Sequence, residues 1–196
     1  MKIELVLFLL PGLVVGLTVH EFAHAISAKW LGDRNPERMG RVSLNPFRHL
    51  SLMGTLALFF LGFGWGKPVE VNIYNFKRPR FYYLLSSLAG PASNLLIAAI
   101  SLGVMYLNPP EPIAVLCLSL FYINCILAVV NLIPIPPLDG SKIWPCLIPG
   151  MKPTFSGKWM NMWMIVLMVF FFSGGIDRVL DPVLGLLAQL LPDIAQ

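Results

Sequence analysis

The stretch Val19-His20-Glu21-Phe22-Ala23-His24 lies at the end of an apolar run that begins at Ile3. In an α-helix, residues four positions apart share a face, so the imidazoles of His20 and His24 point the same way. Two such imidazoles are able to hold a zinc ion, and Glu21 is placed to take a proton from a water molecule at that ion. Polar and charged groups inside an apolar span are costly and usually mark functional sites. The stretch therefore predicts a metal site within a membrane-spanning helix, with hydrolysis as its chemistry.

The composition is that of a membrane protein. Of the 196 residues, 57% are hydrophobic and only 12% are charged, whereas a soluble domain carries roughly 25% charged residues. The mean hydropathy is +0.74. The net charge of +4 does not indicate a nucleic-acid partner, because the basic residues lie in loops between apolar runs, where they set orientation in a lipid bilayer. We expect one catalytic domain over residues 1–196, with a zinc-site core at about 5–144.

The apolar runs predict an all-α polytopic membrane protein with about four transmembrane helices, a re-entrant or β-loop element and a short C-terminal helix. A span needs about 20 apolar residues to cross the hydrocarbon. The segment 179–191 is too short to span alone, so we expect it to lie in the interface or to pack as a bent end. The four predicted spans cover residues 3–31, 81–107, 113–130 and 158–172.

The apolar segment 50–65 is short and broken by glycines, so it is either a short span or a segment that enters the membrane and returns. The segments on either side of it, 33–49 and 67–80, are both basic. A full crossing would put these two segments on opposite sides, which the positive-inside rule disfavours. We therefore expect a re-entrant hairpin with residues 66–72 as its extended arm.

The loop charges also predict the orientation in the membrane. The basic segments 33–49, 67–80 and 141–158 are expected on the cytoplasmic side of the cell membrane. Residues 108–112, which carry no Lys or Arg, are expected outside. Because water must reach the metal, the active site should face the cytoplasm.

Asp139 is the predicted third metal ligand. Pro134, Pro136 and Pro137 forbid a regular helix just before it, and such a break at membrane depth is tolerated mainly at sites. A catalytic zinc takes three protein ligands and leaves one position open, and the two histidines supply only two. The alternative is that Asp139 caps the N-terminus of the segment that follows.

Asn94 closes the stretch Ala89-Gly90-Pro91-Ala92-Ser93-Asn94 inside the second predicted span. The small residues of this stretch allow close helix packing. Asn94 itself is either a substrate or oxyanion contact or a partner in an interhelical hydrogen bond, and the sequence leaves both open.

The chain resembles the site-2 protease family of intramembrane zinc metalloproteases in three stretches. These are HEFAH, residues 89–94, and the segment from Asn131-Leu-Ile-Pro134 to Asp139-Gly140. The likeness is to the short bacterial members without a PDZ or CBS domain. It implies hydrolysis in or near a transmembrane segment of a membrane-protein substrate, at a bacterial plasma membrane. It also implies His20, His24 and Asp139 on one Zn²⁺, Glu21 as general base on the zinc-bound water, and Asn131 as an oxyanion donor.

Two other classes of function use similar residues. A membrane zinc or proton transporter would show repeated halves with ligands shared between them, and the sequence shows neither. A catalytically silent scaffold that binds membrane proteins would have lost Glu21 or a ligand, and none is missing. The sequence leaves open the identity of the substrate, a regulatory membrane partner and homo-oligomers.

Overall fold

The structure, a computed structural model, describes residues 3–52, 54, 66–152 and 160–191. In this part of the chain the secondary structure is helical apart from one isolated antiparallel bridge between Leu50 and Gly66. The elements are α1 (Ile3–Leu31), α2 (Asn35–Arg38), the 3₁₀ turns η1 (Pro46–Arg48) and η2 (Ile73–Asn75), α4 (Pro79–Met105), α5 (Glu111–Asn131), α6 (Gly140–Leu147), α7 (Met160–Phe172) and α8 (Gly175–Ala188).

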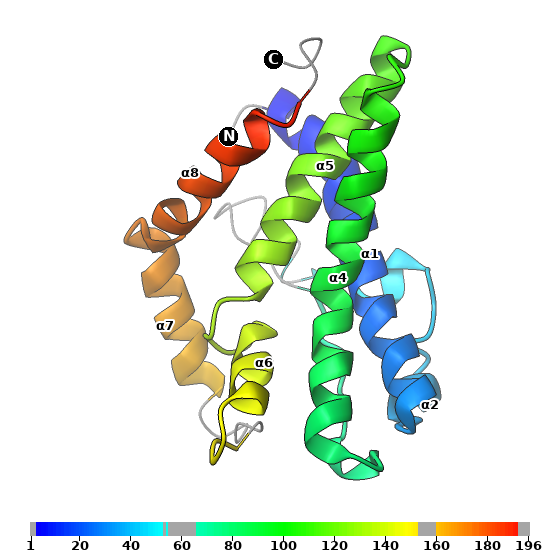
Figure 1. Cartoon of the computed structure of the whole chain (residues 1–196), viewed down its shortest axis with the longest axis vertical. Helices are drawn as coiled ribbons and strands as arrows, with labels where there is room; N and C mark the ends of the chain where they lie inside the picture. Colours follow the sequence, from blue (N-terminus) through cyan, green and yellow to red (C-terminus); the bar gives the residue numbers. More distant parts are fainter. Residues whose placement is uncertain (1–2, 53, 55–65, 153–159, 192–196) are drawn as a thin grey trace.

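Three long helices, α1, α4 and α5, pack side by side along the length of the molecule, and each contacts the other two (Figure 1). All three are long and apolar enough to cross a membrane. Helices α7 and α8 meet at a 58° bend and together form a candidate fourth span. The predicted class, an all-α polytopic protein with about four spans, is confirmed. The C-terminal helix begins at Gly175, a few residues earlier than predicted.

Two glycines allow α1 and α5 to approach closely. A Cβ added at Gly12 would lie 2.6 Å from the carbonyl oxygen of Ser119, and one at Gly16 would lie 2.8 Å from a methyl group of Leu127. A larger residue at Gly12 would meet backbone and force the helices apart, whereas one at Gly16 would require the Leu127 side chain to move. Small residues four positions apart are the usual means of close packing between transmembrane helices.

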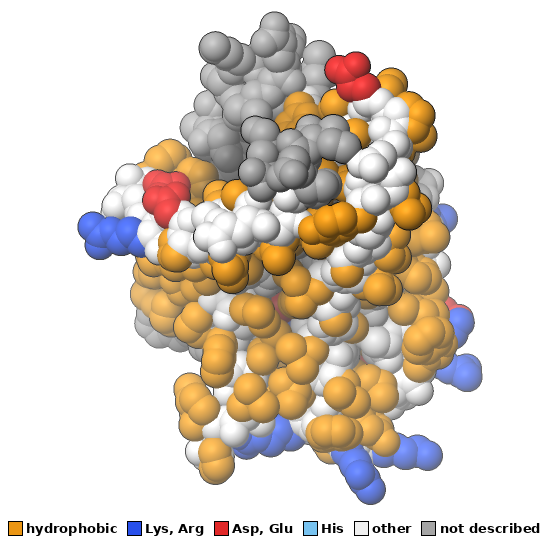
Figure 2. Space-filling model, turned by 45° about the horizontal axis from the view of Figure 1, so that its top comes forward, with side chains coloured by type: hydrophobic (Ala, Val, Ile, Leu, Met, Phe, Trp, Pro, Cys, Tyr) orange, Lys and Arg blue, Asp and Glu red, His pale blue; other side chains and the backbone are white. Residues whose placement is uncertain are grey.

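The basic segments share one end of the bundle. In Figure 1, α2, the start of α4 and α6 lie at the lower end, and the α4–α5 turn lies at the upper end. Figure 2 shows a broad apolar surface with Lys and Arg side chains gathered mainly below it. This is the charge distribution expected when the lower end lies at the cytoplasmic surface.

Both ends of the segment predicted to re-enter the membrane lie together, and a Cβ on Gly66 would lie 3.9 Å from Glu21 Oε1 of α1. Leu50 pairs with Gly66, and the Lys67 N–H donates to the His49 carbonyl at 2.6 Å. A single crossing would separate these ends by the ~30 Å thickness of the hydrocarbon, so the pairing favours re-entry. The path of the chain over 55–65 lies outside the described residues.

The arm, residues 66–72, is fastened to the end of α1 by the fully buried carboxylate of Asp33. Its Oδ2 accepts a hydrogen bond from the Asn72 N–H at 2.7 Å, and its Oδ1 accepts from Asn75 Nδ2 at 2.7 Å. Hydrogen bonds to a charged acceptor are roughly twice as strong as neutral ones. The C-terminal end of the arm is therefore fixed to α1, with Asn72 in an extended conformation.

Helix α6 is fixed at both ends. At its start, a Cβ on Gly140 would lie 2.3 Å from the carbonyl oxygens of Leu132 and Ile133, so only glycine lets α6 approach the end of α5 this closely. At its end, Arg80 of α4 donates to the carbonyls of Pro145 and Cys146, each at 2.8 Å. These contacts hold the start of α6 against the end of α5 and the end of α6 against α4.

Because the basic segments lie at one end of the bundle, cysteines placed in them should be labelled from the same side of the membrane. In a variant without the three native cysteines, single cysteines replacing the exposed Phe47 and Tyr74 should react with an impermeant thiol reagent from the same side. A cysteine replacing Leu107, at the opposite end, should react from the other side. Labelling of positions 47 and 74 from opposite sides would show that 50–65 crosses the membrane.

Candidate metal centre

The metal centre begins with two histidines on one face of α1. His20 and His24 lie one turn apart, both are buried, and their Nε2 atoms are 3.1 Å from each other. The rings meet edge to face, with centroids 4.6 Å apart. This is the arrangement that the spacing of the two residues predicts.

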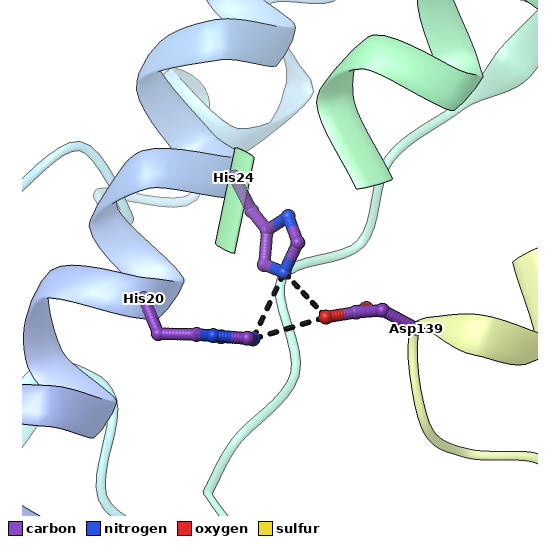
Figure 3. Close-up of side chains that lie close together, drawn as sticks. All are labelled: His20, His24 and Asp139. Atoms are coloured by element: carbon purple, nitrogen blue, oxygen red, sulfur yellow. Dashed lines mark hydrogen bonds and ion pairs between the residues drawn. The ribbon is translucent and has the colours of Figure 1, made fainter. Parts of the chain in front are cut away.

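Asp139 completes the cluster from a different part of the chain. Its Oδ2 lies 3.0 Å from His20 Nε2 and 2.8 Å from His24 Nε2 (Figure 3). Asp139 does occupy the N-cap position of α6, but its side chain makes no capping hydrogen bond. The carboxylate turns toward the imidazoles instead. The structure thus brings together the three side chains predicted as ligands.

The three converging atoms form a donor set suited to a metal ion. Two imidazole nitrogens and one carboxylate oxygen are typical zinc ligands and leave a fourth position open. Within the described residues, no other group of three His, Cys, Asp or Glu side chains is placed to hold an ion.

Gly90 of α4 leaves space for an ion beside these atoms. A Cβ at this position would lie 2.3 Å from His24 Nε2 and 2.7 Å from His20 Nε2. The sequence predicted Gly90 only as a small residue for helix packing. The structure places it against the metal centre, and a glycine inside an otherwise good helix was the signal available.

Each proposed ligand has a second partner on its other side. The Nδ1–H of His24 donates to the Ser86 carbonyl at 2.7 Å, which leaves Nε2 free to bind a metal. Asp139 Oδ1 accepts from Lys142 Nζ at 2.9 Å, so only Oδ2 faces the histidines. Such outer contacts orient metal ligands and fix the histidine tautomer. No sequence pattern predicted Ser86 or Lys142 as part of the site.

Lys142 keeps its charge beside the site. Desolvation alone would lower the pKa of its ammonium group, but the neighbouring Asp139 carboxylate raises that pKa above its usual value. A charged lysine compensates the buried carboxylate, which would otherwise be costly to desolvate.

Glu21 lies half-buried beneath the arm. Its Oε2 accepts a hydrogen bond from the Val69 N–H at 3.0 Å, and a Cβ on Gly66 would lie 3.9 Å from its Oε1. Next to the site is a cavity of about 20 Å³, room for about one water molecule. The cavity is lined by His24 and by side chains from the arm, α4 and α6. These are Val69, Val71, Tyr83, Ser86, Ser87 and Lys142.

The two predicted asparagines occupy different surroundings. Asn131 is half-buried at the end of α5, where its Nδ2 donates to the Leu127 carbonyl at 2.9 Å. Asn94 is fully buried, and its Oδ1 lies 2.6 Å from His20 Nδ1, the ring nitrogen that faces away from Asp139. Asn94 also makes an interhelical hydrogen bond to Asn124 at 2.8 Å.

Comparison with known proteins identifies the family. The model of "Peptidase family M50" matches residues 110–174, which include Asn131 and Asp139. "Putative zinc metalloprotease YwhC" of Bacillus subtilis is 36% identical over 193 residues, covering 93% of this chain and 88% of that protein. The chain belongs to peptidase family M50. The predicted resemblance to site-2 proteases is thereby confirmed, and the protein is a multi-pass membrane zinc metalloprotease.

More distant M50 relatives are longer than this chain. "Putative zinc metalloprotease Rip2" of Mycolicibacterium smegmatis is 31% identical over 157 residues, which are 75% of this chain but 58% of that protein. The protein of the same name from Mycobacterium tuberculosis H37Rv is 32% identical over 151 residues, 74% of this chain and 57% of that protein. No solved structure matches the chain.

The space at Gly90 can be tested by filling it. Gly90→Ala should reduce bound zinc by at least about 10-fold, because the new methyl group would press on both imidazoles and displace metal ligands. The measurement is zinc per chain in purified protein. Gly103→Ala is the matched control, because Gly103 lies on the same helix and its Cβ would meet no atom within 4 Å. Full zinc content in Gly90→Ala would show that this space is not needed for the ion.

Proposed function

We propose that this metalloprotease hydrolyses peptide bonds in or near transmembrane segments of membrane proteins. The observation that supports this most directly is the buried His20–His24–Asp139 cluster between helices that are long and apolar enough to span a membrane. A protease whose ligands lie inside such a bundle meets substrates that are themselves in the membrane. The activity rests on His20, His24 and Asp139 as the zinc ligands.

The site lies toward the end of the bundle that carries the basic segments. His24 is seven residues before the end of α1 at Leu31, which is about 10 Å along the axis at 1.5 Å per residue. Water therefore has a short path to the site from that end. The positive-inside rule makes this end cytoplasmic, so we propose cleavage near the cytoplasmic surface of the cell membrane.

Glu21 is the proposed general base. Zinc, when bound, supplies a Lewis acid that acidifies water and polarises a carbonyl oxygen. Glu21 accepts the proton of the attacking water and passes it to the leaving amine. The Val69 N–H holds one oxygen of the Glu21 carboxylate and so orients the group.

Asn131 is the proposed oxyanion donor. Its Nδ2 carries two hydrogens, and the bond to the Leu127 carbonyl uses one of them. The second hydrogen is available for a substrate carbonyl oxygen as negative charge develops on it. The Leu127 bond holds the amide in one orientation, which is the preorganisation that this kind of catalysis requires.

The arm, residues 66–72, is the proposed docking edge for the substrate. A helical substrate hides its carbonyls in its own hydrogen bonds, so it must unwind before cleavage. An unwound segment can pair with an exposed edge as an added strand. Residues 66–72 offer such an edge directly above Glu21, because the Val69 N–H is bonded to that side chain.

Substitutions separate the base from the ligands. Glu21→Gln keeps the size of the side chain but cannot accept a proton, so it should retain zinc and lose cleavage by at least about 10²-fold. Asn131→Ala should also retain zinc, with a loss of about 10²–10³. Asp139→Ala and His24→Ala should lose both zinc and activity.

The measurement uses a transmembrane substrate in liposomes, with zinc content and turnover determined on the same preparations. Normal cleavage by zinc-loaded Glu21→Gln would contradict the proposed mechanism. Full zinc content in His24→Ala would contradict the ligand assignment.

A further inference from the structure

Two asparagines are fully buried in the middle of the apolar bundle, Asn94 on α4 and Asn124 on α5. A primary amide taken out of water costs free energy unless its hydrogen bonds are replaced. Here they are replaced by a chain of bonds that crosses three helices and ends at His20. The donors and acceptors along this chain of bonds are all fixed in one order. That order determines which atom of Asn94 faces His20.

The chain of bonds begins on α5. Asn124 Nδ2 donates to the Leu120 carbonyl at 2.8 Å, and Asn124 Oδ1 accepts from Asn94 Nδ2 at 2.8 Å. Asn94 Nδ2 also donates to the Gly16 carbonyl of α1 at 3.2 Å. The other end of the Asn94 amide, Oδ1, lies 2.6 Å from His20 Nδ1.

Backbone carbonyls fix the orientation of both amides. The carbonyl oxygens of Leu120 and Gly16 can only accept, so the amide atom facing each of them must be the NH₂ group. Asn94 is therefore anchored twice, by Gly16 directly and by Asn124. The Asn94 oxygen therefore faces His20, and the His20 ring must donate a hydrogen bond to it from Nδ1–H. A neutral imidazole with its proton on Nδ1 has its lone pair on Nε2, the atom that faces Asp139 and His24.

The outer contacts of the two histidines form a pattern on α4. Ser86, Gly90 and Asn94 are spaced four residues apart and share one face of that helix. Ser86 accepts from His24, Asn94 faces Nδ1 of His20, and Gly90 between them leaves the space against the two Nε2 atoms. One face of α4 thus meets both rings.

We propose that Asn94 is a positioning residue for the metal ligand His20, and that Asn124 and the Gly16 carbonyl hold the Asn94 amide in the required orientation. This inference rests on the proposed zinc ligands. Gly16 contributes a second time, because a Cβ there would lie 2.9 Å from Asn124 Oδ1. A larger residue at position 16 would push Asn124 out of the chain of bonds.

A purely interhelical role is the alternative, and two substitutions of Asn94 separate the roles. Asn94→Leu removes the acceptor for His20 together with the donations to Gly16 and Asn124. Asn94→Asp removes the same donations but keeps an oxygen for the His20 N–H, as in the carboxylate–histidine–zinc arrangement. A purely interhelical role predicts that both variants change alike. A positioning role predicts that only Asn94→Leu binds zinc weakly.

The experiment measures the zinc dissociation constant of the full chain in detergent by chelator competition, with thermal unfolding followed on the same samples. Asn94→Leu should bind zinc about 10- to 100-fold more weakly, the usual effect of losing an outer-shell partner. Asn94→Asp should stay within about 10-fold of wild type although it is less stable. Ser119→Ala is the matched control, because Ser119 Oγ accepts from the Gly12 N–H at the same α1–α5 interface, away from His20.

Folded Asn94→Leu with zinc affinity within about 10-fold of wild type would overturn the proposal. If Asn94→Leu does not fold, Asn94→Asp decides: affinity within about 10-fold of wild type supports the proposal, and a larger loss overturns it. The ligand assignment is tested separately by His24→Ala. If His24→Ala retains zinc, the proposed function is wrong. If His24→Ala loses zinc but Asn94→Leu retains it, only this inference is wrong.

Discussion

The convergence of three electron-pair donors inside an apolar bundle is the constraint on which the rest of the structure depends. His20 Nε2, His24 Nε2 and Asp139 Oδ2 lie within 3.1 Å of one another, and all three side chains are buried. Such groups are stable in a low-dielectric interior only when charge and hydrogen bonds compensate them. The surrounding chain provides this compensation through the Ser86 carbonyl, Lys142 and Asn94, and it leaves space for a cation beside Gly90.

The metal centre also requires close helix packing. Its ligands come from α1 and the start of α6, and the outer partners of these ligands come from α4 and α6. Glycines permit close packing at three of these contacts. Gly16 lets α5 approach α1, Gly90 lets the imidazoles approach α4, and Gly140 lets α6 approach the end of α5. In lipid the hydrophobic effect does not drive helices together, so packing and interhelical hydrogen bonds carry the association. The same contacts that hold the bundle together therefore set the geometry of the metal centre.

The sequence predicted the parts of this arrangement that follow from local rules. The spacing of His20 and His24 places them on one face of a helix, and the prolines before Asp139 predict a break near it. Loop charges predicted that 33–49 and 67–80 share one end of the molecule. The partners that depend on three-dimensional packing were not predictable in the same way. No local pattern indicates that a carbonyl at Ser86 meets His24, or that Asn94 faces the outer nitrogen of His20, because these contacts depend on the rotation of α4 against α1.

The position of the arm would link the proposed substrate docking to the proposed base through α1. That helix carries both histidines and Glu21, and Asp33 lies two residues after its end. Glu21 bonds the Val69 N–H and Asp33 bonds the Asn72 N–H, so the arm is fixed at two points to the element that carries the proposed base. A substrate strand paired with the arm would therefore be placed relative to Glu21 by the arm's own hydrogen bonds. Since effective proximity depends on the reacting groups being held in a defined geometry, this shared support explains how an unwound segment could be presented to the site in one register.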